Sequence, residues 1–291
     1  MQLARAGMLS AMAVVGWSAE IAEAQDKVLL RYQFAPGQVL RYQISQDTQV
    51  ERKVGDSTEK MTSRGNSIRQ RKVVEIDSQG NAAVELSLLK VKLEATLPGS
   101  PPLVFESDKP DQASPAFAKY RRVVGRPLAV IKLAPNGTVL DQKPLLQDEA
   151  AQAMVTRNGQ LALPLPAEPV AVGASWRHNF DVDLRLPTGE VRKLAMQQIF
   201  TLAQVQRDIA TLEYKTAILT PLNDPALEAQ VVQYQPEGRV EFDIRRGMVL
   251  TQELAVDKTV VGFAGGTSAM RILDRLTERL MPDGKQIGSA K

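Results

Sequence analysis

The sequence contains no cysteine, one histidine, and only seven Phe, five Tyr and two Trp among 291 residues, with a formal net charge of +3. Without cysteine the chain can form neither disulfides nor thiolate metal sites, and it offers no thiol for the lipidation of exported lipoproteins. His178, the single histidine, excludes a multi-histidine metal site. Few aromatic residues and scattered basic residues argue against a nucleic-acid-binding surface. We therefore expect a non-catalytic protein without a metal, a cofactor or a nucleic-acid partner.

No run of apolar residues is long enough to span a bilayer as a helix. The apolar stretch Met8–Trp17 is far shorter than the roughly 20 residues that a transmembrane helix needs. It is followed by Ala22-Glu23-Ala24, a small-x-small pattern typical of signal peptidase cleavage. We expect residues 1–24 to be a signal peptide, with a membrane anchor as the alternative. Residues 25–291 would then form a single exported domain, periplasmic or secreted.

Strand signals dominate the rest of the chain, because apolar residues recur at every second position in several segments. Polar or charged residues lie between them, so one face of each strand is expected to be covered and the other to meet water or a partner. This pattern predicts a mainly β protein built on an antiparallel sheet. The apolar sets are Val28-Leu30-Tyr32-Phe34, Phe180-Val182-Leu184-Leu186, Ala210-Leu212-Tyr214 with Ile218, and Val240-Phe242-Ile244.

The same order of strand and turn signals occurs twice. Turns predicted at Pro36-Gly37, Gly80-Asn81 and Pro135-Asn136-Gly137 are matched later by Val172-Gly173, Arg207-Asp208 and Arg245-Arg246-Gly247. We expect repeat one at about residues 28–140, a connecting helix and linker at about 141–169, and repeat two at about 170–281. Each half alone has nothing to bury its apolar face against. The repeats are therefore expected to continue one strongly bent antiparallel sheet, a half-barrel or open barrel.

One or two short helices are expected to cover the concave face of this sheet. The first begins at Ser114-Pro115 and ends before Gly125, with Phe117 and Tyr120 on one side. The second is predicted from Pro144 to about Thr156, where apolar residues recur at helical spacing.

Two further segments are ambiguous. The proline-rich segment Leu97–Pro110 is expected to be a loop or lid. Thr267–Met281 fits both a helix and a strand, and a strand is favoured because Gly262–Gly266 would form the turn of a hairpin before it.

Several motifs resemble an uncharacterised family of secreted bacterial proteins, classed as a domain of unknown function. They are Leu30–Tyr42 (LRYQFAPGQVLRY), the connector Leu163-Pro164-Leu165-Pro166 leading to Val170–Trp176, and Phe242-Asp243 ahead of Gly247. The resemblance would cover most of the mature chain, and its turn and strand-entry motifs imply a fold rather than an activity. More distantly, the topology is similar to that of LolA-like lipoprotein and lipid carriers, in which a bent sheet surrounds an apolar cavity. No carrier residue can be transferred to this sequence.

The candidate ligand-binding residues are apolar side chains of the second half. They would form either a solid core or the wall of a cavity, and periodicity does not distinguish the two. They are Trp176, Phe180, Leu212, Tyr214, Ile218, Phe242 and Ile244.

Three other features have simpler interpretations. Asp181 and Asp183 would share the polar face of a strand, where carboxylates stay hydrated more often than they bind a cation. Gly262–Gly266 lacks the Gly-Lys-Ser/Thr ending of a phosphate loop. Asn136-Gly137-Thr138 fits an N-glycosylation acceptor, but the hairpin turn explains it sufficiently.

The sequence therefore favours an exported, non-catalytic protein that binds a lipid-like or other apolar ligand, or an apolar segment of an envelope protein, in the concave face. The alternative is a structural or protein-interaction component of the bacterial envelope without a small-molecule ligand. Such a component would use its sheet edges and Arg271, Arg275 and Arg279 on the outer face. A hydrolase that depends on His178 is the third hypothesis.

Overall fold

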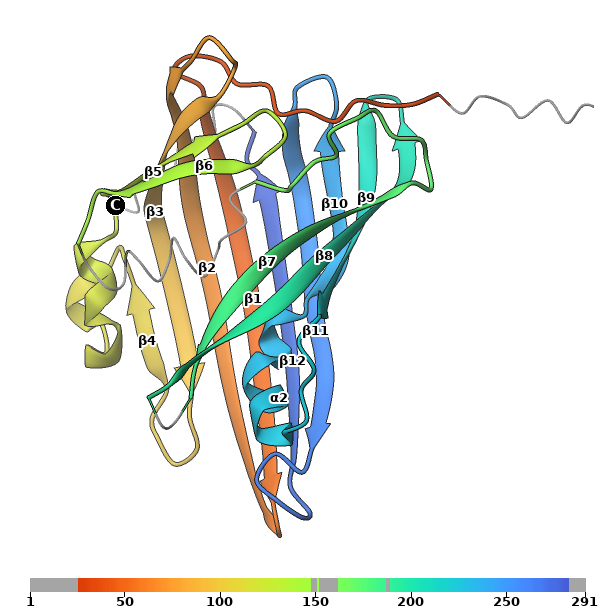
Figure 1. The fold of residues 1–291 in the computed structure, drawn as a ribbon. Helices are drawn as coiled ribbons and strands as arrows, with labels where there is room; N and C mark the ends of the chain where they lie inside the picture. Colours follow the sequence, from red (N-terminus) through yellow and green to blue (C-terminus); the bar gives the residue numbers. More distant parts are fainter. Residues whose placement is uncertain (1–25, 148–150, 152–161, 187–188, 283–291) are drawn as a thin grey trace, which may run out of the picture.

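The computed structural model describes residues 26–147, 151, 162–186 and 189–282 (Figure 1). The predicted signal peptide, residues 1–24, lies outside them. The described residues form one 12-stranded antiparallel sheet, which bends strongly without closing into a barrel. The predicted fold class, a mainly β protein with a bent, open antiparallel sheet and short helices, is confirmed. Among the described residues, no helix is both long and apolar enough to cross a membrane.

The strands fall into two halves along the chain, with short helices between some of them. The first half contains β1 (Val39–Val54), β2 (Ser57–Ile76), β3 (Ala82–Thr96), β4 (Leu103–Glu106), β5 (Pro127–Leu133) and β6 (Val139–Pro144). The second half contains β7 (Ser175–Arg185), β8 (Val191–Gln206), β9 (Ile209–Ile218), β10 (Glu237–Asp243), β11 (Met248–Val261) and β12 (Ala269–Leu280). The described helices are the 3-10 helices η1 (Pro110–Gln112), η2 (Pro115–Arg122) and η3 (Val232–Tyr234), and the α-helix α2 (Pro225–Val231).

Most strands of the sheet pair with their neighbours in the sequence, as in a meander. Its strand order is β6-β5-β3-β2-β1-β12-β11-β10-β9-β8-β7, with β4 paired to β3 outside this path. The first strand therefore pairs with the last, through a ladder that runs from Tyr42 opposite Leu280 to Lys53 opposite Ala269. The two ends of the path, β6 and β7, follow one another in the sequence, and the opening of the sheet lies between them.

The predicted turns are present. Gly37, Gly80, Gly137, Gly173 and Gly247 all have positive φ, a conformation that glycine adopts without the steric cost of a side chain. The favoured strand at Thr267–Met281 is confirmed as β12, which pairs with β11 after the Gly262–Gly266 turn.

The predicted strand at Val28–Phe34 is wrong, because this extended segment joins the sheet only through a bridge between Val28 and Val170. The Tyr32 amide instead donates to the Pro135 carbonyl at 2.7 Å, and the Gln33 amide to the Gly247 carbonyl at 3.1 Å. The segment thus crosses the turns of two hairpins. Its period-two pattern arises because alternate side chains enter the core, with Leu30 fully buried.

The extended segment at residues 26–36 and the connector at residues 162–170 lie across one end of the bent sheet, the upper end in Figure 1. We call residues 26–36 and 162–170 together the plug. The Leu163 amide donates to the Tyr32 hydroxyl at 2.7 Å, and the Trp176 indole donates to the Pro164 carbonyl at 2.7 Å. Leu163 and Leu165 are both buried. The plug therefore ties the start of the chain to the connector between the two halves.

The first predicted helix is present as a 3-10 helix, η2, whose ring residues Phe117 and Tyr120 pack near Phe105 of β4. The start of the second predicted helix is wrong, because Pro144 belongs to β6. Most of that predicted helix, at 148–150 and 152–156, lies outside the described residues.

The helix α2, which lies inside the second half between β9 and β10, was not predicted from the sequence. The Asp224 carboxylate accepts a hydrogen bond from the Ala226 amide at 2.9 Å, and Pro225 occupies the start of the helix, a favourable N-terminal arrangement. Leu227 and Val231 are buried against the sheet. This short helix covers the lower part of the concave side (Figure 1).

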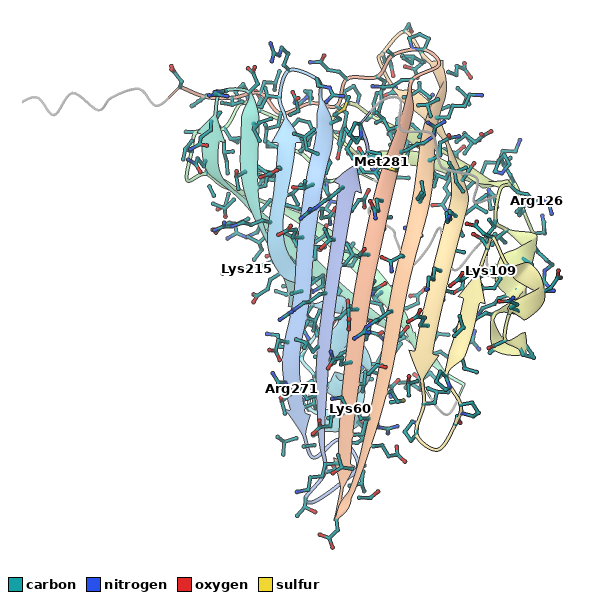
Figure 2. All side chains as sticks on the ribbon, turned by 180° about the vertical axis from the view of Figure 1, so that it is seen from behind. Lys60, Lys109, Arg126, Lys215, Arg271 and Met281 are labelled. Carbon is teal, nitrogen blue, oxygen red and sulfur yellow. The ribbon has the colours of Figure 1, made fainter. Side chains whose placement is uncertain are left out.

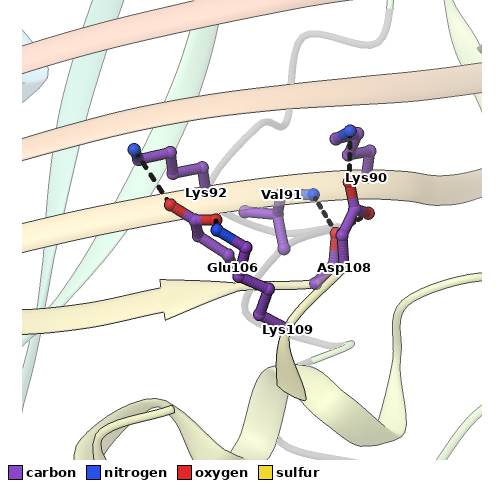
Figure 3. A network of polar contacts seen from close by, with 7 residues as sticks. Lys90, Val91, Lys92, Glu106, Asp108 and Lys109 are labelled. Carbon is purple, nitrogen blue, oxygen red and sulfur yellow. Dashed lines mark hydrogen bonds and ion pairs between the residues drawn. The ribbon is translucent and has the colours of Figure 1, made fainter. Parts of the chain in front are cut away.

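The prediction that Leu97–Pro110 is a loop or lid is wrong, because the segment contains β4, which pairs with β3 along Lys92–Ala95. Figure 3 shows how polar contacts reinforce this pairing. Lys92 Nζ lies 3.0 Å from Glu106 Oε1, Lys90 pairs with Asp108, and the Val91 amide donates to Ser107 Oγ at 3.1 Å. The segment is thus fixed to β3 and is not free to swing.

Each half contains three successive strands, then an insertion with short helices, then a hairpin: β1–β2–β3 with β5–β6, and β7–β8–β9 with β10–β11; β4 and β12 have no counterpart in this order. An internal duplication fits this order. The repeat boundaries stay a prediction.

The close approach of the plug predicts an unequal response to alanine at two turn glycines. A Cβ on Gly137 would lie 2.1 Å from the Leu163 carbonyl oxygen, whereas a Cβ on Gly173 would meet nothing within 4 Å. Their φ values, 82° and 87°, are similar. Gly173→Ala should therefore lower the free energy of unfolding by about 1–2 kcal/mol through backbone strain alone. Gly137→Ala should lower it by roughly 3 kcal/mol or more, because the plug must also move.

Urea denaturation followed by tryptophan fluorescence measures both changes. Equal losses for the two variants would show that the plug does not pack against the hairpin turn as described.

Candidate functional site

The two faces of the sheet are identified from the burial pattern and the register. On β1, Tyr42 and Ile44 are buried, whereas Gln43 and Ser45 are exposed. Residues directly opposite each other in an antiparallel ladder share a face, so the registers extend this assignment to every strand. The plug and α2 pack on this buried face, on the inner side of the bent sheet in Figure 1, and we call it the concave face.

Five of the seven predicted ligand-binding residues join the main hydrophobic core below the plug. In this core the Phe242 ring meets the Tyr32 ring edge-on at 5.5 Å, and the Trp176 ring stacks on Phe200 at 5.6 Å between centroids. The five are Leu212, Tyr214 and Phe242, which are buried, and Trp176 and Ile244, which are partly buried.

The structure does not bring the other two residues into this cluster. Ile218 packs at the lower end, in a cluster that contains Leu227 and Val231 of α2. Phe180 lies beside His178, with 6.4 Å between ring centroids. Period-two spacing correctly places these residues on one face, but six residues separate Leu212 from Ile218, or about 20 Å along a strand.

A row of residues, several of which belong to the main hydrophobic core, crosses the concave face. Each member lies directly opposite the next in the ladders, and we call the set the transverse row. It consists of Trp176, Phe200, Tyr214, Gly238, Leu254, Leu276, Gln46, Gly65 and Leu93.

Side chains of the transverse row are buried on β8 and β9 and become more exposed toward β11, β12 and β1. Phe200 and Tyr214 are buried, whereas Leu254 and Leu276 are partly exposed and Gln46 is exposed. Solvent therefore reaches the middle of the concave face, where apolar side chains line most of the row. The plug covers the upper end of this face, and α2 with η3 packs on Val256 and Ile272 near its lower end.

A polar contact marks the boundary toward the lower end. Gln46 Nε2 donates to Asp274 Oδ1 at 3.1 Å, and the Thr48 hydroxyl also donates to Asp274. All three side chains lie on the concave face by register, so this carboxylate is held by neutral donors rather than by a cation.

A buried ion pair lies on the upper side of the row. Arg71 of β2 reaches across β1 to Glu278 of β12, with 2.5 Å between Nη2 and Oε1. Its guanidinium carbon lies 4.2 Å from the centre of the Tyr42 ring, and the Tyr42 hydroxyl donates to the Val249 carbonyl at 3.1 Å. Burial acts to lower the pKa of Arg71, but Glu278 and Tyr42 raise it more, so the net shift is upward. The charge of this pair is thus satisfied inside the sheet.

Arg69, two residues earlier on the same face, is in a different situation. It lies opposite Tyr42 and Leu88, each only 1% exposed. Within the described part of the chain, its guanidinium has no hydrogen-bond or ion-pair partner. Burial lowers the pKa of Arg69, and Arg71 adds to this effect, whereas Glu278 opposes it. A charged side chain thus points into the concave side without a matching carboxylate.

A second incompletely satisfied polar group lies on β8. Gln198, 4% exposed, donates from Nε2 to the Tyr214 hydroxyl at 3.3 Å. Its Oε1 atom is buried and has no partner among the described residues. Burial raises the pKa of Tyr214 to about 12, so this phenol stays protonated at neutral pH. β8 therefore carries a buried side-chain amide, that of Gln198, next to the aromatic side chain of Tyr214.

The residues considered for catalysis or cation binding are not assembled into a site. His178 lies on β7, and partial burial lowers its pKa. Asp181 and Asp183 are exposed on the opposite face, where Asp181 lies 3.7 Å from Lys193. In the described ranges no group of three or more His, Asp or Glu residues is placed to hold a metal ion.

The convex face, seen in Figure 2, carries cross-strand ion pairs. Arg271 pairs with Asp257 at 3.1 Å and Arg279 with Glu253 at 3.0 Å. Two of the three arginines proposed as a basic docking surface are therefore neutralised by neighbours on β11. The hydrogen bond from Arg271 also lowers the pKa of Asp257.

Sequence reasoning missed the part of the concave face that the first half and β12 contribute. Arg69 and Arg71 have the same parity as Val73, so they occupy positions where a covered face normally has apolar side chains. Charged residues at such positions were a readable signal. Their partner Glu278 could not be identified without the β1–β12 pairing.

Comparisons with known proteins support the fold only. No protein-family model and no curated protein matches the chain. The chain is similar to a solved structure of lipid–protein interactions in lipovitellin, with a TM-score of 0.50 and 11% identity over 89% of this chain. It spans only 27% of the lipovitellin chain. A Pseudomonas aeruginosa MucA/MucB complex covers 84% of this chain and 89% of its own at 12% identity, but its TM-score of 0.11 carries no structural argument.

The buried ion pair predicts a large difference between two glutamates on neighbouring strands. Glu278→Gln leaves Arg71 buried without its counter-charge and should lower the free energy of unfolding by about 3 kcal/mol. The matched change on the convex face, Glu253→Gln, removes only an exposed partner of Arg279 and should cost less than about 1 kcal/mol. Chemical denaturation of both variants measures the difference. Similar small losses would contradict a buried pair that holds β12 to β2 across β1.

Proposed function

We propose that this is an exported, non-catalytic protein that binds a lipid-like or other apolar ligand in its concave face. The observation that carries the proposal is the transverse row. Leu254 and Leu276 remain partly exposed in the middle of a face whose ends are covered by the plug and by α2. An apolar ligand laid along this row would remove these side chains from water.

Hydrophobic burial would supply the affinity. Covering about 300 Å² of apolar protein and ligand surface contributes roughly 7 kcal/mol at 25 cal/mol per Å², before the cost of immobilising the ligand. The site is therefore suited to a ligand with a long apolar part rather than to a small polar metabolite.

The structural comparison is compatible with this proposal. Lipovitellin, whose structure concerns lipid–protein interactions, shares the bent-sheet fold. The distant topological resemblance to LolA-like carriers that the sequence suggests would imply the same ligand class. Because one fold serves many functions, the partly exposed apolar side chains of the transverse row support the proposal more than the shared fold does.

Export and the absence of catalysis are parts of the proposal that rest on the sequence. Met8–Trp17 followed by Ala22-Glu23-Ala24 supports cleavage and export. The single histidine, His178, and the separation of the other titratable candidates support a binding role. No specific observation favours the alternative of an envelope-interaction protein, since Arg271 and Arg279 are already paired.

Two glutamines of β1 provide a direct test of the concave face. Gln46 lies in the transverse row, and Gln43 is exposed on the opposite face of the same strand. Gln46→Trp should fill the middle of the concave face and weaken binding of the neutral fluorescent probe N-phenyl-1-naphthylamine by about tenfold or more, equivalent to about 1.4 kcal/mol. Gln43→Trp, the matched control, should leave the affinity unchanged.

Fluorescence titration of the folded variants measures both affinities. Equal affinities for the two variants, or no probe binding by the native sequence, would contradict ligand binding in this face.

A further inference from the structure

We propose that the ligand is an anionic amphiphile whose carboxylate or phosphate head group is bound by Arg69. The inference rests on the proposed function and deepens it, since it assigns a chemical class to the polar end of the ligand. The transverse row would take the apolar chain.

The position of Arg69 supports this role. It lies on the concave face of β2, between the buried side chains of Tyr42 and Leu88 in the adjacent strands. The ladder with β3 is irregular between Ile68 and Arg69. The extra residue of this irregularity, Leu89, belongs to β3, so Arg69 keeps its regular position opposite Tyr42 in the ladder with β1.

The local charge balance leaves Arg69 in excess. Glu278 is engaged by Arg71 at 2.5 Å, and the remaining neighbours of Arg69 in the register are aromatic or aliphatic. Within the described residues no second carboxylate forms an ion pair with either arginine. The concave face therefore holds two guanidinium groups and one carboxylate at this level.

An unpaired, partly buried guanidinium is unfavourable unless a counter-charge is supplied. An anionic head group supplies one, and the planar guanidinium can bind two oxygens of a carboxylate or phosphate at once. Burial also lowers the pKa of Arg69, which agrees with a positive charge that the surrounding protein does not fully compensate. Fold stability alone gives no reason for an arginine at this position, since an apolar residue would satisfy the buried environment.

The distance between the two parts of the proposed site fits an amphiphile. Gly65 is the β2 member of the transverse row, and Arg69 lies four residues farther along the same face. Four residues of a strand span about 13 Å. A head group at Arg69 can thus be continuous with an apolar chain in the row.

Three ligands with the same 18-carbon chain test the inference: oleate, oleyl phosphate and oleyl alcohol, each titrated calorimetrically below the concentration at which it aggregates or separates from solution. We expect at least one of the two anions to bind about tenfold or more tightly than the alcohol, as a charge-assisted interaction predicts. The tighter of the two identifies the head group as carboxylate or phosphate. Arg69→Gln should abolish the preference for the anion while leaving the affinity for oleyl alcohol unchanged.

Matched variants separate charge from structure. Arg69→Lys keeps the positive charge and should retain part of the preference. Arg64→Gln removes an arginine from the same strand, where it pairs with Asp47 on the convex face, and should have no effect on binding. Without ligand, Arg69→Gln should leave the melting temperature unchanged or raised, and the preferred anion should raise the melting temperature of the native sequence more than that of the variant.

The outcomes distinguish this inference from the function on which it rests. Binding of all three ligands with equal affinity would overturn the role of Arg69 and leave apolar ligand binding intact. Binding of none would overturn both. A lower melting temperature of Arg69→Gln with an unchanged preference for the anion would show that Arg69 is neutralised within the protein, which also overturns the inference.

Discussion

The pairing of β1 with β12 is the constraint on which the rest of the structure depends. It joins the two ends of the described chain through a ladder from Tyr42 opposite Leu280 to Lys53 opposite Ala269. Because of this pairing, Glu278 meets Arg71 across β1, and Leu276 becomes the neighbour of Gln46 in the transverse row. The buried ion pair and the continuous concave face are therefore consequences of one long-range contact. Such contacts are costly in chain entropy and must be repaid by burial and hydrogen bonding.

Closing the meander at β1 and β12 leaves it open between β6 and β7, which are consecutive in sequence. The plug covers the upper end, where the Leu163 amide donates to the Tyr32 hydroxyl and the Trp176 indole donates to the Pro164 carbonyl. The helix α2 covers the lower end through Leu227 and Val231. In the middle of the concave face, Leu254 and Leu276 keep their apolar side chains partly exposed to solvent. The proposed site is therefore the part of the concave face that neither the plug nor α2 covers.

Much of the fold could be predicted from local patterns, because alternation and turn glycines are local properties. The turn at Gly80 and the hairpin around Gly137 were predicted in this way. Other features depend on distant contacts: the segment Val28–Phe34 alternates like a strand yet crosses hairpin turns, since only the tertiary structure decides whether alternate side chains enter a sheet or a core. The helix at Asp224-Pro225 carried a readable capping signal that was overlooked.

For the site, Trp176 and Tyr214 lie in the transverse row, as the sequence pattern allowed. Arg69 acquires its significance only from Glu278, which lies more than 200 residues away and is already paired with Arg71.

Native mass spectrometry of the protein, purified without detergent and combined with lipid extraction of the same sample, tests the central claim most directly. The account predicts a reproducible adduct in the lipid mass range, with an anionic lipid recovered in the extract. A clean mass of the protein alone, together with no uptake of oleate or oleyl alcohol added afterwards, would contradict it and show that the concave face is not a lipid-binding site.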